Sequence, residues 1–239
     1  MKKYFPYIGA VVALIVLVVL ASFMVLRNQN RKMGKIYTEN VQANGNDFIN
    51  DEMVRKMIAK KIDYNKLTIG NLHTDSIESW LTRNQFVKNA QVYHTPKGEL
   101  MVRFEQKNPI ARVKNRNIQY YITDEFEKIP LSPIYSADVM LVSGDIEKSE
   151  YEDLVHLIQY IDADNLLKNN ITGIKKERKN FFILSVNSGS YDVAIGNLEN
   201  LDEKFTKLKC FYDQYLSKMG TDVYRRIDLS YKKQVVGVK

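Results

Sequence analysis

The residues best able to do chemistry are three histidines and one cysteine. His73, His94 and His156 are far apart in the sequence and belong to no metal-binding or acid–base motif. Cys210 has no motif-placed base that could activate its thiol. A single cysteine also cannot form an internal disulfide or build a metal cluster. We therefore expect no catalytic residue and no metal site in this chain.

The acidic residues give no stronger signal. Asp124, Glu125 and Glu127 fall in a strand-to-strand turn, where such residues are common. The sequence contains no hydrolase nucleophile elbow, phosphate loop or dinucleotide fingerprint. We expect a protein that is not an enzyme and has neither a cofactor nor a small-molecule substrate. The enzyme alternative is a membrane-anchored cell-wall hydrolase, which an activity assay on wall material would detect.

Residues 8–26 form an uncharged apolar run, and the location of the rest of the chain depends on how this run is interpreted. Crossing a bilayer core takes about 20 apolar helical residues, whereas the apolar core of a secretory signal has about 7–15. The run leads directly to Arg27, Arg31 and Lys32. We predict a retained membrane-spanning helix at 8–26, a tail at 1–7 and a connector at 27–32. No second such run follows, so the rest lies on one side of the membrane; the flanking charges do not decide which side.

The composition limits which folds and partners are possible for the rest of the chain. Of 239 residues, 45% are hydrophobic, so the part after the span can bury one large core or two small ones. The net charge is +7, from 35 basic and 28 acidic residues. No dense basic block or aromatic-interleaved nucleic-acid motif accompanies this excess. We interpret it as a solvated basic surface and expect no nucleic-acid partner.

Residues 33–107 predict a small α+β domain. A strand at 33–43 is followed by a turn at 44–47, a helix capped by Asn50 and a second helix that opens at Thr74. The apolar period then changes from helical spacing to two, on either side of a turn at 95–98. The predicted order is strand, helix, helix, strand, strand.

Residues 108–239 predict a second domain of mixed strands with at least two helices. The helices are expected at 151–161 and 201–219, and the chain closes with extended segments at 223–238. In the closing part, Ile227, Leu229 and Tyr231 are expected to share one face. Residues 234–238 are uncharged, although natural sheet edges are usually blunted by charge. This strand is therefore a candidate template for a partner strand.

The whole layout resembles the bacterial cell-division family FtsQ, called DivIB in some lineages, and its Bacteroidetes branch in particular. The family has a short tail, one span, a POTRA domain and a β-domain. The segment Tyr224-Arg225-Arg226-Ile227-Asp228-Leu229-Ser230-Tyr231 is the most specific match. Further matching segments lie at 87–92, 98–102 and 108–113 in and after the POTRA part, and at 120–122, 195–197, 204–212 and 234–236 in the β-domain.

The resemblance implies a non-enzymatic divisome scaffold in the cell inner membrane at the septum. Its N-terminus would be cytoplasmic and both domains periplasmic, with the POTRA domain meeting other divisome components. Its last β-domain strand would take up a strand of an FtsB-like partner, with an FtsL-like protein attached through it. The matching partner-binding residues are Leu229, Ser230, Tyr231, Lys232, Lys233, Gln234, Val235 and Val236.

Two departures from the family pattern and one alternative remain. Ser230 stands where the family often has Arg, which puts any polar contact of that Arg in doubt. The turn Asp124-Glu125-Phe126 stands where the family usually has Gly, which affects turn geometry. The alternative function is a POTRA-type membrane-anchored factor of protein export or outer-membrane assembly, although such chains normally carry tandem POTRA units or a barrel.

Overall fold

The computed structural model describes residues 5–41, 48–63, 66–187, 189–216, 218, 220 and 223–239. They form two compact units, Met1–Gln106 and Lys107–Lys239, and each is described here by itself. The turn expected at 44–47 and the first residues of the expected tail lie outside the described residues.

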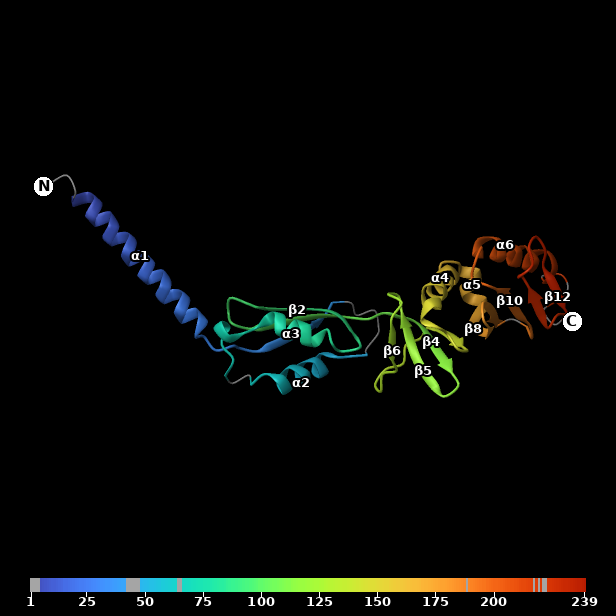
Figure 1. Ribbon diagram of the computed structural model, residues 1–239, viewed down its shortest axis with the longest axis horizontal. Helices are drawn as coiled ribbons and strands as arrows, with labels where there is room; N and C mark the ends of the chain where they lie inside the picture. The colour runs from blue at the N-terminus through green and yellow to red at the C-terminus, as the bar shows by residue number, and fades with distance from the viewer. Residues whose placement is uncertain are drawn as a thin grey trace. The chain divides into compact units, whose positions relative to one another are not determined.

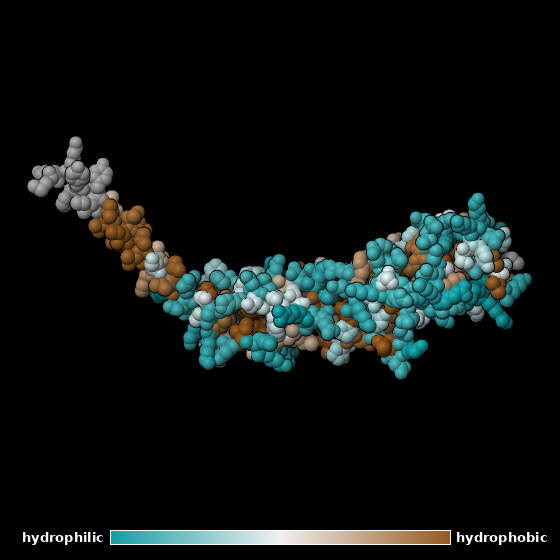
Figure 2. Space-filling model, in the orientation of Figure 1, coloured by the Kyte–Doolittle hydropathy of each residue, from teal (hydrophilic) through white to brown (hydrophobic). Residues whose placement is uncertain are grey.

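The chain opens with helix α1, Phe5–Gln29. Its part from Gly9 to Gln29 is long and apolar enough to cross a membrane, by length and composition, and none of it is buried in the protein. The surface of α1 is mostly apolar, in contrast to the polar surface of the units that follow (Figure 2). The helix continues past Leu26, the predicted end of the span, and takes in Arg27, Asn28 and Gln29 of the predicted connector.

The rest of the first unit has the predicted order of strand, helix, helix, strand, strand (Figure 1). Strand β3 is central, parallel to β1 and antiparallel to β2. The elements are β1 (Ile36–Asn40), α2 (Asp51–Lys61), the 3-10 turn η2 (Ile69–Asn71), α3 (Thr74–Leu81), β2 (Val87–His94) and β3 (Leu100–Gln106).

Helices α2 and α3 each bury one face against the sheet. The Asn50 side chain accepts a hydrogen bond from the Met53 amide at 2.9 Å, and this contact fixes the start of α2. Val54 and Ile58 of α2 pack with alternate residues of β3, Leu100 and Val102, in one apolar core. The alternation of buried and exposed side chains along β3 explains why a period of two appears in its sequence.

The second unit is built on one mixed sheet of nine strands, in the order β12-β11-β10-β9-β8-β7-β4-β5-β6. Its strands are β4 (Pro109–Asn115), β5 (Ile118–Thr123), β6 (Lys128–Pro130), β7 (Met140–Ser143), β8 (Ile171–Arg178), β9 (Phe181–Val186), β10 (Asp192–Gly196), β11 (Arg226–Asp228) and β12 (Val236–Val238). Its helices are η3 (Lys148–Glu150), α4 (Tyr151–Asp162), α5 (Asn165–Asn170), α6 (Leu201–Phe211) and the π-helical turn η4 (Tyr212–Leu216).

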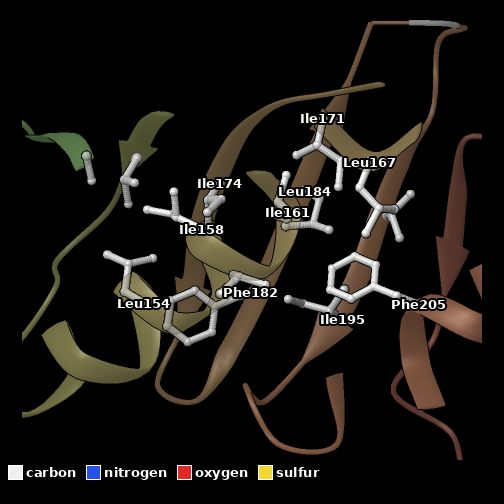
Figure 3. Packing of buried hydrophobic residues seen from close by; sticks show 14 of the residues in the cluster. Leu154, Ile158, Ile161, Leu167, Ile171, Ile174, Phe182, Leu184, Ile195 and Phe205 are labelled. Carbon is white, nitrogen blue, oxygen red and sulfur yellow. The ribbon is translucent and has the colours of Figure 1, made fainter. Parts of the chain in front are cut away.

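The core of this unit lies between the helices and one face of the sheet. Figure 3 shows Leu154, Ile158 and Ile161 of α4 facing Phe182 and the other apolar side chains of the sheet. These four named side chains are at most 2% exposed. At about 1.5–3 kcal/mol for each fully buried large apolar side chain, this cluster is the main stabilising contribution of the unit.

The expected helix at 201–219 differs from the structure. Regular α-helix stops at Phe211 and a wider π-helical turn follows. The wider turn changes the spacing of the side chains along the helix: Tyr212 is half-buried, whereas Tyr215 is 50% exposed. The ring of Tyr215 instead stacks on Phe211, with ring centroids 5.4 Å apart.

Candidate partner-binding edge

Strand β12 forms one edge of the nine-stranded sheet. It runs antiparallel to β11, with Val236 opposite Asp228, Gly237 opposite Ile227 and Val238 opposite Arg226. Among the described residues, no further strand pairs with its outer side. Backbone N–H and C=O groups on the outer side of such a strand can template the addition of another strand.

The two edges of the sheet differ in how they are protected. At the opposite edge, β6 ends in Pro130, which has no N–H to donate, and carries Lys128, whose ammonium lies 4.0 Å from the centroid of the Tyr120 ring. Proline and lysine are the usual means of blocking edge-to-edge pairing. Strand β12 has neither residue, and Val238 is 47% exposed. Of the two edges, β12 is thus the one without these blocking residues.

Strand β11 anchors this edge to the core. It is parallel to β10, and the Leu229 amide donates to the Ala194 carbonyl at 2.8 Å, just beyond the end of β11. The side chains of Ile227 and Leu229 are fully buried. The expectation that these two share one face is confirmed, and the structure turns that face to the core.

The segment between β11 and β12 consists of residues 229–235 and reverses the chain direction. The Asp228 carboxylate accepts hydrogen bonds from the Ser230 amide at 2.8 Å and from the Ser230 hydroxyl at 2.6 Å, which turns the chain away from the sheet. The Lys207 ammonium of α6 donates to the Tyr231 carbonyl at 2.9 Å. Lys233 then has a φ of +62°, in the left-handed region that reverses the chain direction.

This connection divides the closing part, predicted as extended segments over 223–238, into two short strands. Leu229 and Ser230 follow β11, Tyr231 to Lys233 make the turn, Gln234 and Val235 lead out of it, and Val236 begins β12. Tyr231, expected on the face of Ile227 and Leu229, is instead 51% exposed. The cause is the side chain of Asp228. It accepts a hydrogen bond from the Ser230 amide, so the strand ends before Tyr231 can pair with a neighbouring strand.

The residues that the prediction left out are Gly237 and Val238, which complete the edge strand. A Cβ atom on Gly237 would lie 2.4 Å from Cε1 of Tyr224, so the absence of a side chain lets the Tyr224 ring cover β12. The Tyr224 ring in turn packs on Phe211, with ring centroids 5.8 Å apart. Both residues lie in the uncharged run at 234–238, which the sequence indicated as a candidate edge.

A groove of about 480 Å³ lies beside the edge, between α6 with its π-turn and the β11–β12 hairpin. Phe211, Tyr215 and Tyr224 supply its aromatic surface, and Val235 supplies an aliphatic one. Val235 is half-buried and also packs against the core of the unit. The edge strand and this groove together offer both backbone hydrogen bonds and an apolar contact surface.

The residues considered first for chemistry do not converge. His156 lies edge-on to Phe126, with ring centroids 5.9 Å apart, and Cys210 is exposed on the groove. In the part of the chain that the structure describes, no three His, Cys, Asp or Glu residues are placed to hold a metal ion. The buried ammonium of Lys204 donates to the carbonyl and side-chain oxygens of Asn197, and burial lowers the pKa of this lysine.

Comparison with known proteins gives two family matches. Residues 108–238 match the model described as FtsQ/DivIB, C-terminal related, and residues 29–105 match the POTRA-like domain. A comparison with curated proteins found no match. Among solved structures, the chain is similar to the major extracytoplasmic domain of the trans isomer of the bacterial cell division protein DivIB from Geobacillus stearothermophilus. That similarity has 13% identity and a TM-score of 0.33, and covers 47% of this chain and 97% of the other.

Proposed function

Because the chain belongs to the FtsQ/DivIB family, we propose that it is a divisome scaffold whose β12 edge takes up a strand from an FtsB-like partner. An FtsL-like protein would join through that partner. The scaffold links early and late division proteins at the septum and has no catalytic step of its own. The protein thus acts by holding other membrane proteins together.

The observation that carries this proposal is the edge strand Val236–Val238, which has no proline or lysine to block strand pairing. A partner strand would gain main-chain hydrogen bonds from β12, and alternate side chains would give specificity. Val236 and Val238 lie on the same side of the strand, because side chains alternate along it. Tyr231 and Val235 flank the strand and complete the contact surface.

The proposed site is a revision of the residue set predicted from sequence. The side chain of Leu229 is fully buried and serves the core, so it would act by fixing β11. Ser230 is engaged by Asp228 and would shape the turn. The residues proposed to touch the partner are Tyr231, Lys232, Lys233, Gln234, Val235, Val236, Gly237 and Val238.

We further propose the membrane arrangement that the family implies. Helix α1 would span the inner membrane, with the N-terminus cytoplasmic and both domains periplasmic. The domains would extend over 33–107 and 108–239, and the POTRA domain would meet other divisome components. Lys and Arg flank α1 on both sides, which leaves the topology to be measured, for example by cysteine labelling from each side of the membrane.

Co-purification from the native membrane tests the function. Deleting 223–239 would be a poor probe, because it removes Ile227 and Leu229 from the core. The double variant V236K/V238K adds charge to the edge and leaves the core intact. We expect the wild-type chain to recover small single-span coiled-coil proteins that the variant loses.

The matched control is Ile118→Lys, which places a lysine at an apolar position of β5 that is 62% exposed. It should recover the same partners as the wild-type chain. Recovery unaffected by V236K/V238K would keep the scaffold function but remove the site from β12. Recovery of export or outer-membrane assembly proteins instead would contradict the divisome function.

A further inference from the structure

A second surface lies in the first unit, where helix α1 joins the domain. Residues 30–33 pair with the connection between α2 and α3: the Met33 amide donates to the Leu67 carbonyl at 3.0 Å and the Ile69 amide to the Arg31 carbonyl at 3.1 Å. A Cβ on Gly70 would lie 3.0 Å from the Cβ of Gln29. The connection is therefore held against the end of α1.

These contacts set the depth of the connection relative to a bilayer that contains α1. Gln29 is three residues beyond Leu26, the last apolar residue of the run, a rise of about 4.5 Å along a helix. The headgroup layer on each side of the hydrocarbon core is about 5–8 Å thick. The connection that touches Gln29 thus lies at the level of the lipid headgroups.

A groove of about 510 Å³ opens beside the same connection. Leu67 and Leu72 of the connection line it, together with Ile77 and Trp80 of α3. Trp80 is half-buried and packs against the core of the unit. An apolar groove with a tryptophan at this depth matches the side chains that favour the membrane interface.

The charges around the groove are mostly positive. Lys61 and Lys66 line it and are exposed. The one acidic lining residue, Asp63, pairs with Lys66 at 3.3 Å, in an exposed contact of the kind that contributes little. At the end of α1, Arg31, Lys32 and Lys35 are exposed as well, and no acidic residue precedes Glu39 in the sequence.

We propose that this groove and its basic rim dock on the bilayer that holds α1 and bind anionic phospholipid headgroups there. The proposal shares with the proposed function only the placement of α1 in a membrane; it does not depend on β12 or on a protein partner. Docking would fix the POTRA-like domain against the membrane surface, since lysines at a headgroup layer attract anionic lipid. Two observations favour anionic lipid as the ligand. The exposed side chains at the groove are mostly basic, and the groove adjoins the end of α1.

The chain carries its own probe, because Trp80 is its single tryptophan. The full chain would be reconstituted in nanodiscs of phosphatidylcholine alone or with phosphatidylglycerol, each with a fraction of lipid brominated near the headgroup. We expect quenching of Trp80 fluorescence that rises with the phosphatidylglycerol content. Each basic residue near such a surface contributes about fivefold to binding, so K61Q/K66Q should weaken docking about 25-fold.

The control K56Q/K88Q removes the same charge from positions outside the groove, where Lys56 pairs with Glu52 and Lys88 with Glu105. It should keep the wild-type quenching, and thermal unfolding should show that both variants remain folded. Equal quenching in the two lipids, absent quenching, or an equal loss in both variants would overturn the proposal. So would a fluorescence change caused by soluble glycerol phosphate in phosphatidylcholine nanodiscs, which would indicate a free anion as ligand. Loss of the partner at β12 would leave this result unchanged.

Discussion

The ammonium of Lys207, on α6, donates to the backbone carbonyl of Tyr231 at 2.9 Å. This contact ties the turn before β12 to the helix that packs on the sheet. The same ammonium lies 3.5 Å from the Leu229 carbonyl and 3.5 Å from the Glu203 carboxylate. The position of the edge strand thus depends on one lysine that is itself only 16% exposed.

Replacing Lys207 with Met should lower the free energy of unfolding of the second unit by about 1–2 kcal/mol, because hydrogen bonds from a charged donor to the turn are lost. The same change should weaken partner binding through a loosened hairpin. Urea unfolding of the two chains measures the first effect. Lys168→Met, at an exposed position of α5, is the control and should change stability by less than about 0.5 kcal/mol.

Lys233→Gly should stabilise the hairpin by about 0.5–1 kcal/mol, since a φ of +62° is strained for lysine and free for glycine. The neighbouring Lys232→Gly should do the opposite, because Lys232 has no positive φ and glycine adds freedom only to the unfolded chain. Thermal unfolding of the pair reads out both signs. Equal effects of the two changes would contradict the turn geometry.

Gly237→Ala should destabilise the edge by about 1–3 kcal/mol, because the added methyl would overlap the Tyr224 ring and force it off β12. Loss of partner binding should follow. Gly34→Ala is the matched control, since its Cβ would meet its nearest neighbour at an ordinary 3.5 Å. Partner binding that survived Gly237→Ala would show that the cover of Tyr224 over β12 is dispensable.

Alkaline pH should destabilise the second unit through Tyr120. Burial, with a smaller contribution from the Tyr151 hydroxyl, raises the pKa of Tyr120 well above its ordinary value of 10.0. As the pH rises past about 10, the unfolded chain loses this proton and the folded one does not, so stability falls. Tyr120→Phe should move the onset of alkaline unfolding to higher pH, measured by circular dichroism, although it loses a hydrogen bond to the Ile146 carbonyl at neutral pH.

The sequence predicted the elements that carry long periodic patterns. The apolar run of α1 and the order of elements in the first unit follow from local spacing, and Ile227 and Leu229 were placed on one face, which the structure buries. The POTRA-like and FtsQ/DivIB matches confirm the family that the motifs resembled.

Features that depend on contacts distant in sequence were missed. Strand β4 was not predicted, although Ala111 and Val113 alternate with Arg112 and Lys114; its parallel pairing with β7 is a contact that local spacing does not reveal. The end of β11 depends on a hydrogen bond from Ser230 to Asp228, and the turn depends on Lys207 of another element. Periodicity alone therefore could not place the turn within the extended segments predicted over 223–238.

One departure from the family pattern that was noted in the sequence can be examined in the structure. The turn Asp124-Glu125-Phe126, where the family usually has Gly, places Phe126 at a φ of +60°. The left-handed geometry that glycine would adopt freely is thus present, and the contact of Phe126 with His156 accompanies it.

The most direct test of the account is photo-crosslinking in growing cells from residue 238. A benzophenone amino acid placed at Val238 should give one main adduct, with a small single-span division protein, and placed at Ile118 should give none. V236K, combined with the probe at 238, should abolish the adduct. A division-protein adduct that forms at 118 but not at 238, or an adduct at 238 that V236K leaves intact, would contradict strand addition at β12.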